Sequence, residues 1–246
     1  MRASFGLFTA FPLQWDPDEV AGGWAATSLV GLVLGIGWLM FHQSFVRVGG
    51  PFVAAGGVLL LHAALTGARP LRGVAAVAQA VTSPSEGEAG RALPDQQGAG
   101  TAVVTLLLLV MSSFLIRVDD APAVLVLIPL VGRTAQALLL GQGDVEVGLP
   151  TPTPLARIAI LVGCVAGMCV APLMATLVRP VRVNPPVAGL ELVALGVLAL
   201  AVALAIGWAW RGWLRVRFGS LDANGWHSIG AVADLAALAL VVARIS

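Results

Sequence analysis

Apolar runs recur along the chain, and most are long enough to cross a lipid bilayer. A spanning helix needs roughly 20 mainly apolar residues to cross a hydrocarbon core of about 30 Å. Only 11% of the 246 residues are charged, whereas soluble domains carry about 25%. The sequence therefore predicts a single-domain, all-α, polytopic integral membrane protein with about seven transmembrane helices. The expected spans are residues 24–41, 51–65, 100–116, 121–140, 156–178, 187–210 and 226–242.

Glycine and proline predict where these helices are interrupted. The second run is short, and a helix broken near Gly67 and Pro70 would continue through residues 74–81. Backbone breaks at membrane depth are tolerated only where they line protein or a water-filled cavity. Pro129 predicts a kink in the fourth run. Residues 66–99 are predicted to form a cytoplasmic loop.

Loop arginines predict the orientation. One side of the membrane receives seven of them and the other side four: Arg2, Arg69, Arg72, Arg91, Arg211, Arg215 and Arg217 against Arg47, Arg117, Arg179 and Arg182. Because cytoplasmic loops carry the excess of positive charge, the N-terminus is expected in the cytoplasm. Five tryptophans at the run ends are predicted to anchor in the headgroup region: Trp24, Trp208, Trp210, Trp213 and Trp226.

Residues 65–80 read Leu-Thr-Gly-Ala-Arg-Pro-Leu-Arg-Gly-Val-Ala-Ala-Val-Ala-Gln-Ala. This stretch resembles the acidic signature of the cobalamin synthase family (adenosylcobinamide-GDP ribazoletransferase), roughly Thr-x-Gly-Leu-His-Leu-Asp-Gly-Leu-Ala-Asp-Thr-Ala-Asp-Gly. The apolar and small positions match at Thr66, Leu71, Gly73, Ala75 and Ala78. The polar positions do not match, because the family's His and three Asp fall on Pro70, Arg72, Ala76 and Gln79.

Shorter segments extend the resemblance over essentially the whole chain. Residues 9–12, the Gly31 and Gly35 spacing, residues 91–99, the Gly132-Arg133 pair and residues 217–219 each resemble family segments in the same order. After residue 219 the family has a further Asp. That Asp falls on Asn224 without a gap and on His227 with three extra residues, and the second alignment matches more positions.

The resemblance implies transfer of a phosphocobinamide group from adenosylcobinamide-GDP to alpha-ribazole, with release of GMP and with Mg²⁺ as cofactor. Mg²⁺ takes oxygen ligands, commonly carboxylates. Asp residues four and three positions apart lie on one helix face, where this chain carries Arg72, Ala76 and Gln79. No catalytic residue of the motif is intact, so a magnesium site is not expected there. Asp95 is the remaining candidate metal ligand, with the acidic cluster at residues 16–19 as a second.

Seven residues are candidates for substrate binding: Thr66, Gly67, Arg72, Asp95, Arg133, Arg217 and His227. Arg72 either clamps a phosphate in place of the metal or contacts lipid phosphate. Arg133 lies inside an apolar run, where an unpaired charge is costly. It is therefore expected to pair with Asp234 or Glu191, or to bind phosphate. His62 is interpreted as an interior residue.

Three functions remain open from the sequence. The first is a degenerate homologue in a bacterial cytoplasmic membrane that binds a corrinoid or nucleotide, or supports an active homologous partner. The second is an active ribazoletransferase with displaced metal ligands such as Asp95. The third is a small transporter or assembly factor in which Arg133, Glu191 and Asp234 line a path. Membrane lipid is an expected partner and a homo-oligomer is left open, whereas a net charge of +1 excludes a strongly basic nucleic-acid binder.

Overall fold

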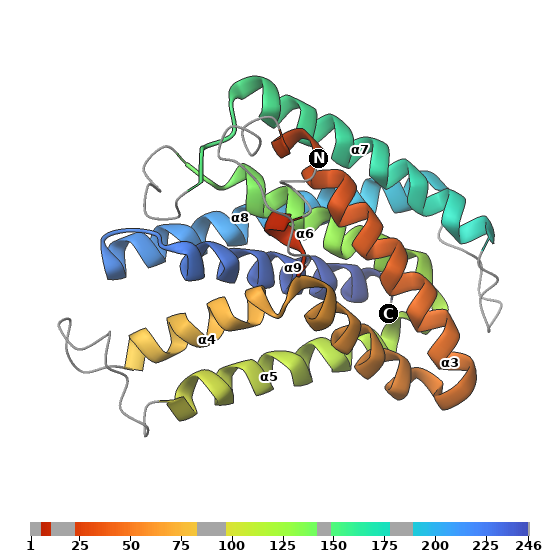
Figure 1. Cartoon of the computed structure of the whole chain (residues 1–246). Coiled ribbons are helices and arrows are strands. Elements are labelled where there is room, and N and C mark those ends of the chain that lie inside the picture. Colours follow the sequence, from red (N-terminus) through yellow and green to blue (C-terminus); the bar gives the residue numbers. More distant parts are fainter. Residues whose placement is uncertain (1–5, 11–22, 83–96, 142–148, 178–188, 246) are drawn as a thin grey trace.

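The computed structural model describes residues 6–10, 23–82, 97–141, 149–177 and 189–245 (Figure 1). About 91% of the structure is helical, and the described residues form no strand. The prediction of an all-α polytopic membrane protein is confirmed. The elements in chain order are η1 (Trp24–Ala26), α3 (Thr27–Thr66), α4 (Arg69–Thr82), α5 (Gln97–Leu115), η3 (Ile116–Asp120), η4 (Pro122–Val126), α6 (Leu127–Leu138), α7 (Pro154–Leu177), α8 (Gly189–Phe218) and α9 (Ala223–Ile245).

Five helical segments among the described residues are long and apolar enough to cross a membrane. They are Trp24–Thr66, Gly98–Val118, Pro154–Met174, Gly189–Phe218 and Ala223–Ile245. The first of them contains two of the expected runs, 24–41 and 51–65. The expected run at 121–140 is represented instead by the shorter apolar segment Pro122–Leu138.

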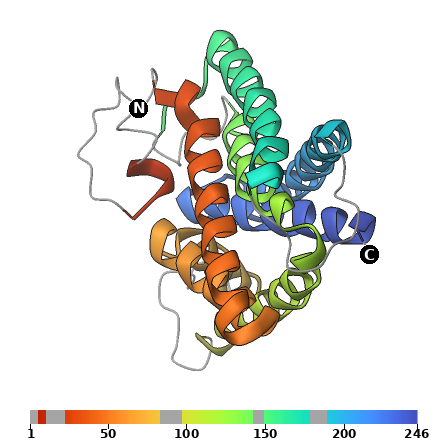
Figure 2. The ribbon, with the colours of Figure 1, turned by 90° about the vertical axis from the view of Figure 1, so that its right-hand side faces the viewer.

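Helix α3 is a hairpin of two helical legs. Its 40 residues would extend about 60 Å if straight, twice the hydrocarbon thickness. Gly50 leaves the helical conformation, with φ 75° and ψ −178°, and Pro51 begins the second leg, a position that proline favours. The legs then pack against each other, since the Trp38 and His62 rings lie 5.1 Å apart between centroids. Figure 2 shows the first leg running the length of the molecule.

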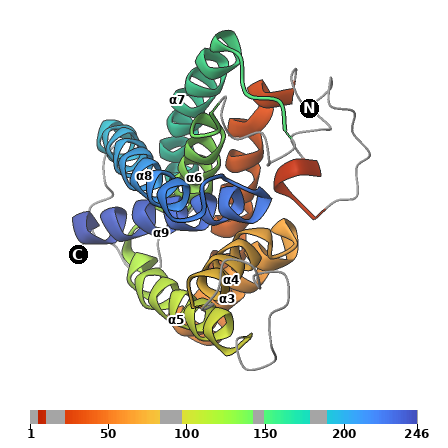
Figure 3. The same ribbon diagram turned by 90° about the vertical axis from the view of Figure 1, so that its left-hand side faces the viewer.

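Helix α6 lies in the core. Every residue from Leu127 to Ala137 is buried, and the helix contacts α3, α7, α8 and α9 (Figure 3). A 12-residue helix extends only about 18 Å, too short for a span and typical of a buried core helix. Pro129 lies in the first turn of α6, where proline is tolerated, and so does not interrupt this helix. The 3-10 segment η4 precedes α6.

Two expectations about local structure need correction. Residues 66–99 are not a continuous loop, because α4 occupies Arg69–Thr82 and α5 begins at Gln97. Of the five tryptophans assigned to the membrane interface, Trp24 and Trp226 are buried in the core and pack edge to face at 6.3 Å. Trp208 remains 67% exposed. A tryptophan at the end of an apolar run can be buried against other side chains, and the sequence alone does not show which tryptophans have such partners.

Close helix packing explains the small residues in the first leg of α3. A Cβ on Gly31 would lie 2.7 Å from Leu130 Cα, and one on Gly35 would overlap the carbonyl oxygen of Val126. The Gly-x-x-x-Gly spacing therefore lets α3 approach η4 and α6 closely, as expected for small residues between membrane helices.

Candidate functional site

The break between α3 and α4 is a left-handed turn. Gly67 has φ 61° and Ala68 has φ 53°, a conformation that only glycine adopts without strain. The Ala68 backbone N–H donates to Ala63 O at 2.7 Å, and the Thr66 hydroxyl donates to His62 O at 2.7 Å. Thr66 therefore closes the end of α3. The family signature carries glycine at the position that Ala68 occupies, so this chain holds strain that the signature avoids.

The N-terminal segment covers the start of α4. Arg69 donates to the carbonyl oxygens of Gly6 and Leu7 at 2.8 and 2.7 Å, and Ala10 N–H donates to Leu65 O at 2.6 Å. Burial and, to a lesser degree, the charge of Arg72 lower the pKa of the Arg69 guanidinium. Pro70 is buried in the first helical turn. Neither Arg69 nor Pro70 carries an acidic group that could bind a metal ion at the start of α4.

The three substituted motif positions lie on one face of α4, and their side chains have different surroundings. Arg72 is exposed, Ala76 lines a pocket, and Gln79 packs against α5, where a Cβ on Gly100 would lie 3.0 Å from its Nε2. An arginine cannot coordinate a cation, alanine has no donor atom, and the glutamine offers only a neutral oxygen. The residues present on α4 therefore do not fit a magnesium ion.

Gly73 brings the two family-like segments into contact. A Cβ on Gly73 would lie 2.5 Å from Asn224 O, 2.7 Å from Ser228 N and 3.0 Å from His227 Cβ. The backbone of α4 therefore approaches the first turns of α9 too closely to admit a side chain at residue 73. Both positions proposed for the lost second-motif Asp, Asn224 and His227, lie at this contact. The two motif segments are therefore in contact with each other under either alignment.

A pocket of about 170 Å³ opens between α4 and the α8–α9 connection. Its lining residues are Ala76, Val77, Ala80, Leu214, Phe218, Ser220, Leu221, Asp222, Asn224 and Gly225. Asp222 caps α9, because its Oδ1 accepts the Gly225 N–H at 2.7 Å. Sequence reasoning missed Asp222, although an Asp just before an apolar helix is a recognisable N-cap signal. It is the one carboxylate among the lining residues.

The electrostatic environment of this contact is basic. The charges of Arg133, Arg69 and Arg72 all act on the half-buried His227. Arg217 is exposed at the end of α8, with its guanidinium carbon 6.0 Å from the centre of the Phe218 ring. Where the family signature concentrates carboxylates, the exposed surface of α4 carries the Arg72 guanidinium. Such a surface favours an anion such as phosphate over a divalent cation.

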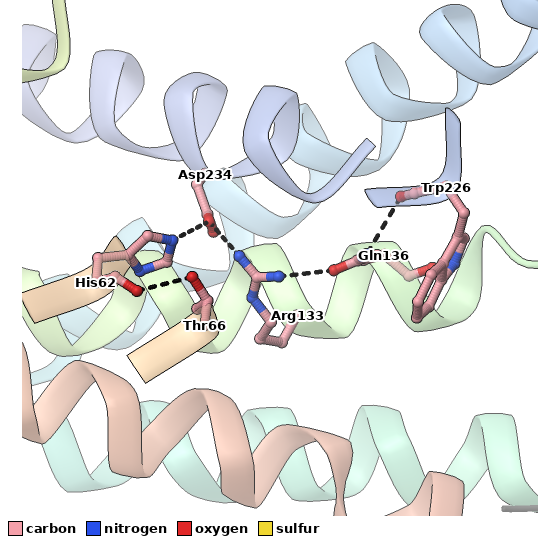
Figure 4. Close-up of polar contacts among 6 residues, drawn as sticks. All are labelled: His62, Thr66, Arg133, Gln136, Trp226 and Asp234. Atoms are coloured by element: carbon pink, nitrogen blue, oxygen red, sulfur yellow. Dashed lines mark hydrogen bonds and ion pairs between the residues drawn. The ribbon is translucent and has the colours of Figure 1, made fainter. Parts of the chain in front are cut away.

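A buried polar network lies beneath this surface (Figure 4). Arg133 of α6 donates to Asp234 Oδ2 at 2.6 Å and to Gln136 Oε1 at 2.8 Å. Arg133 and Asp234 are each 1% exposed. Of the pairings expected for Arg133, the structure shows the one with Asp234, whereas Glu191 is exposed in the first turn of α8. The structure does not bring Glu191 together with this pair.

His62 joins the network from the second leg of α3. Its Nε2 lies 3.8 Å from Asp234 Oδ2. The Nδ1 of His62, the Nε of Arg133 and the Oδ1 of Asp234 have no hydrogen-bond partner among the described residues. Buried polar atoms are usually satisfied, so these three atoms are exceptions in a network that is otherwise paired.

Gln136 connects the network to the candidate site. Its Nε2 donates to Trp226 O, and the Trp226 indole donates back to Gln136 O, both at 3.2 Å. Trp226 immediately precedes His227. This reciprocal pair therefore fixes the first turn of α9 against α6 and holds His227 beside α4. Nothing in the sequence pattern singled out Gln136.

Two glycines make room for the network. A Cβ on Gly132 would overlap Asp234 Oδ1, and a Cβ on Gly230 would lie 2.5 Å from Gln136 Oε1 and 3.1 Å from Arg133 Nη1. The family-like Gly132-Arg133 pair thus has a physical reason: the arginine supplies the charge and the glycine admits its carboxylate partner. Gly230 of α9 makes room for the same network.

Several predicted residues lie outside the described part of the chain or away from the candidate site. Asp95 and the acidic cluster at residues 16–19 lie outside the described residues. In the described part of the chain, no three His, Cys, Asp or Glu side chains gather where they could hold one metal ion. Cys164 is buried and Cys169 is exposed, because five residues along a helix turn the side chain to another face.

The fold and this site define a polytopic helical membrane protein whose two motif-bearing segments meet above a buried ion pair. The family model described as cobalamin-5-phosphate synthase matches residues 1–244, and the chain belongs to this family. The family links the chain to cobalamin biosynthesis, and its long apolar helices link it to a membrane. No curated protein and no solved structure matches this chain.

Proposed function

We propose that this chain binds a phosphate-bearing ligand of cobalamin biosynthesis, a corrinoid or a nucleotide, without catalysing the transfer reaction by itself. In this role it supports an active homologous partner. The proposal concerns the ligand and the lost activity, and it builds on the family membership. The observation that carries it is the face of α4, where Arg72, Ala76 and Gln79 replace the three carboxylates of the family signature.

The lost carboxylates matter because of the chemistry that the family implies. Displacement at a pyrophosphate accumulates negative charge, which a divalent cation normally neutralises. On α4 the three positions now carry one positive and two neutral side chains. A positive side chain repels a divalent cation. This face of α4 therefore lacks the groups that would hold Mg²⁺ against the reacting phosphates.

Anion binding is the chemistry that remains at this site. Arg72 is exposed, and its charge, like that of Arg69, acts on His227. The adjoining pocket is lined mainly by apolar side chains, with Asp222, Asn224 and Ser220 as polar groups. Arg72 lies one helical turn before the pocket-lining Ala76, where its guanidinium suits a phosphate, and the apolar lining suits a flat organic group. Both are parts of a nucleotide.

The proposed site faces the cytoplasm. The support is the excess of arginine, seven against four, on the side that receives the N-terminus, α4 and the end of α8. Nucleotide substrates are cytosolic, so a site on this face would be accessible to them. Tagging the N-terminus and testing its accessibility in inverted and right-side-out vesicles checks this orientation.

The test measures binding and transfer in the same preparation. Purified full-length chain in detergent is incubated with Mg²⁺, alpha-ribazole and adenosylcobinamide-GDP, and GMP release is followed by chromatography. Binding of GDP as a probe is followed by thermal unfolding. We expect stabilisation by GDP that falls at least threefold in Arg72→Gln, with no GMP released above background.

The control is Arg47→Gln, which removes an exposed arginine close to Gly50, where α3 folds back on itself. This variant is expected to leave GDP binding unchanged. Robust GMP release lost in Arg72→Ala would contradict the proposal. Mg²⁺-dependent release lost in Asp95→Asn would instead support the active enzyme with displaced ligands. An absence of any GDP effect would contradict the binding half of the proposal.

A further inference from the structure

A second pocket lies at the opposite end of the α8–α9 pair from the candidate site. Its volume is about 440 Å³, and it is lined by Glu191, Ala194, Leu195, Leu198, Arg244 and Ile245. The first four residues come from the start of α8 and the last two from the end of α9. Figures 2 and 3 both show these two helix ends toward the same side of the molecule.

The α8 wall of this pocket runs from a charge to apolar side chains. Glu191, Ala194, Leu195 and Leu198 follow the spacing of one helix face. Glu191 lies in the first turn of α8, and Leu198, seven residues further along, lies about 10 Å deeper along the helix axis. A membrane lipid has the same order, with a charged headgroup at the surface and apolar chains below.

The α9 wall supplies the opposite charge. Arg244 lies in the last turn of α9 and is exposed, as is Glu191. One cation and one anion therefore flank a single apolar pocket at the end of two spanning helices. A headgroup that carries both a phosphate and an ammonium group is complementary to this arrangement. A carboxylate has about four acceptor sites, so Glu191 can accept hydrogen bonds from such an ammonium group in addition to the contact it already makes.

We propose that this pocket binds a zwitterionic phospholipid whose headgroup carries a primary ammonium group, as in phosphatidylethanolamine. Arg244 binds the phosphate, Glu191 accepts hydrogen bonds from the ammonium group, and Leu195 and Leu198 contact the first part of an acyl chain. A primary ammonium is favoured over a trimethylated one because only the former has N–H donors for the carboxylate. This inference is independent of the transfer chemistry.

The competing explanation is that the two charges only compensate helix dipoles. A glutamate in the first turn and an arginine in the last turn of a helix are both stabilising. That explanation predicts a stability effect that is the same in every lipid. The lipid site predicts an effect that depends on the headgroup, so the two explanations can be separated.

The experiment uses purified full-length chain in detergent, titrated with dioleoyl phosphatidylethanolamine, its mono- and dimethylated forms, and dioleoyl phosphatidylcholine. Bound lipid is counted by native mass spectrometry, and thermal unfolding is measured in parallel. For the wild type we expect the bound fraction to fall stepwise with each added methyl group, at least threefold over the series. This arm needs no variant.

The variants assign the contacts. Glu191→Gln is expected to remove the dependence on methylation, and Arg244→Gln to weaken binding of every lipid in the series. Arg47→Gln is the matched control and should behave like the wild type. Equal binding of all four lipids by the wild type would overturn the proposal. Dioleoyl phosphatidylglycerol is titrated in the same way. If the wild type binds it more tightly than phosphatidylethanolamine, and Glu191→Gln binds it equally tightly, the pocket belongs to anionic lipid and the proposal is overturned.

Discussion

Arg133 on α6 and Asp234 on α9 form an ion pair at 2.6 Å, although 101 residues separate them in the chain. Both side chains are buried, and the pair connects the central helix to the helix that carries His227. Burying two charges is costly, and a buried pair need not add net stability. The fold does require both partners of the pair, because either one alone would be an uncompensated charge at membrane depth.

Removing one partner of this pair should therefore destabilise the protein strongly. We expect Asp234→Asn to lower the free energy of unfolding by about 3 kcal/mol or more, measured by denaturation in detergent. The double variant Arg133→Met with Asp234→Leu should be less destabilised than either single variant. Additive losses in the double variant would contradict the pairing.

The contact between α4 and α9 depends on the absence of a side chain at Gly73. Gly73→Ala would place a Cβ 2.5 Å from Asn224 O, and backbone atoms cannot yield easily. We expect a loss of about 1–3 kcal/mol, read from thermal unfolding. Gly56→Ala is the control, because a Cβ there meets nothing within 4 Å. Equal effects of the two substitutions would show that the close approach is not as described.

Ala68 provides a test of backbone strain. Its φ of 53° costs an L-residue about 1–2 kcal/mol relative to glycine. Ala68→Gly should therefore stabilise the folded state by about 1 kcal/mol, less the added flexibility of glycine in the unfolded chain. A fall in the unfolding temperature of this variant would argue against the left-handed turn.

Restoring the carboxylates should restore a response to Mg²⁺. In the triple variant Arg72→Asp, Ala76→Asp and Gln79→Asp, we expect Mg²⁺ to raise the unfolding temperature by a few degrees, since a ligand that binds only the folded state stabilises it. The wild type should show no such rise. A triple Asn variant is the matched control. Failure of the Asp variant to respond would mean that α4 no longer supports a metal site.

Much of the fold follows from the apolar runs, because crossing a bilayer demands length and apolarity together. The runs could not reveal that residues 121–140 form a short central helix, since a buried core helix and a span have similar composition. Trp24 and Trp226 illustrate the same limit: their positions at run ends predicted the membrane surface, but their partners are Phe8 and each other.

For the candidate site, the motif resemblance identified residues but not their contacts. Arg133 was recognised as needing a partner because a charge in an apolar run is costly, and that argument included Asp234 as one option. Gln136 and Asp222 were missed, because a polar residue in a helix and a capping Asp have many structural explanations. The closeness of Gly73 to Asn224 depends on tertiary packing, which no local pattern encodes.

We propose that this chain does not carry out the family's transfer reaction on its own. The most direct measurement is GMP formation by the purified wild-type protein over a range of Mg²⁺ concentrations, beside a reaction without protein. The account predicts the same background rate at every Mg²⁺ concentration. A rate that rises and saturates with Mg²⁺ would contradict it.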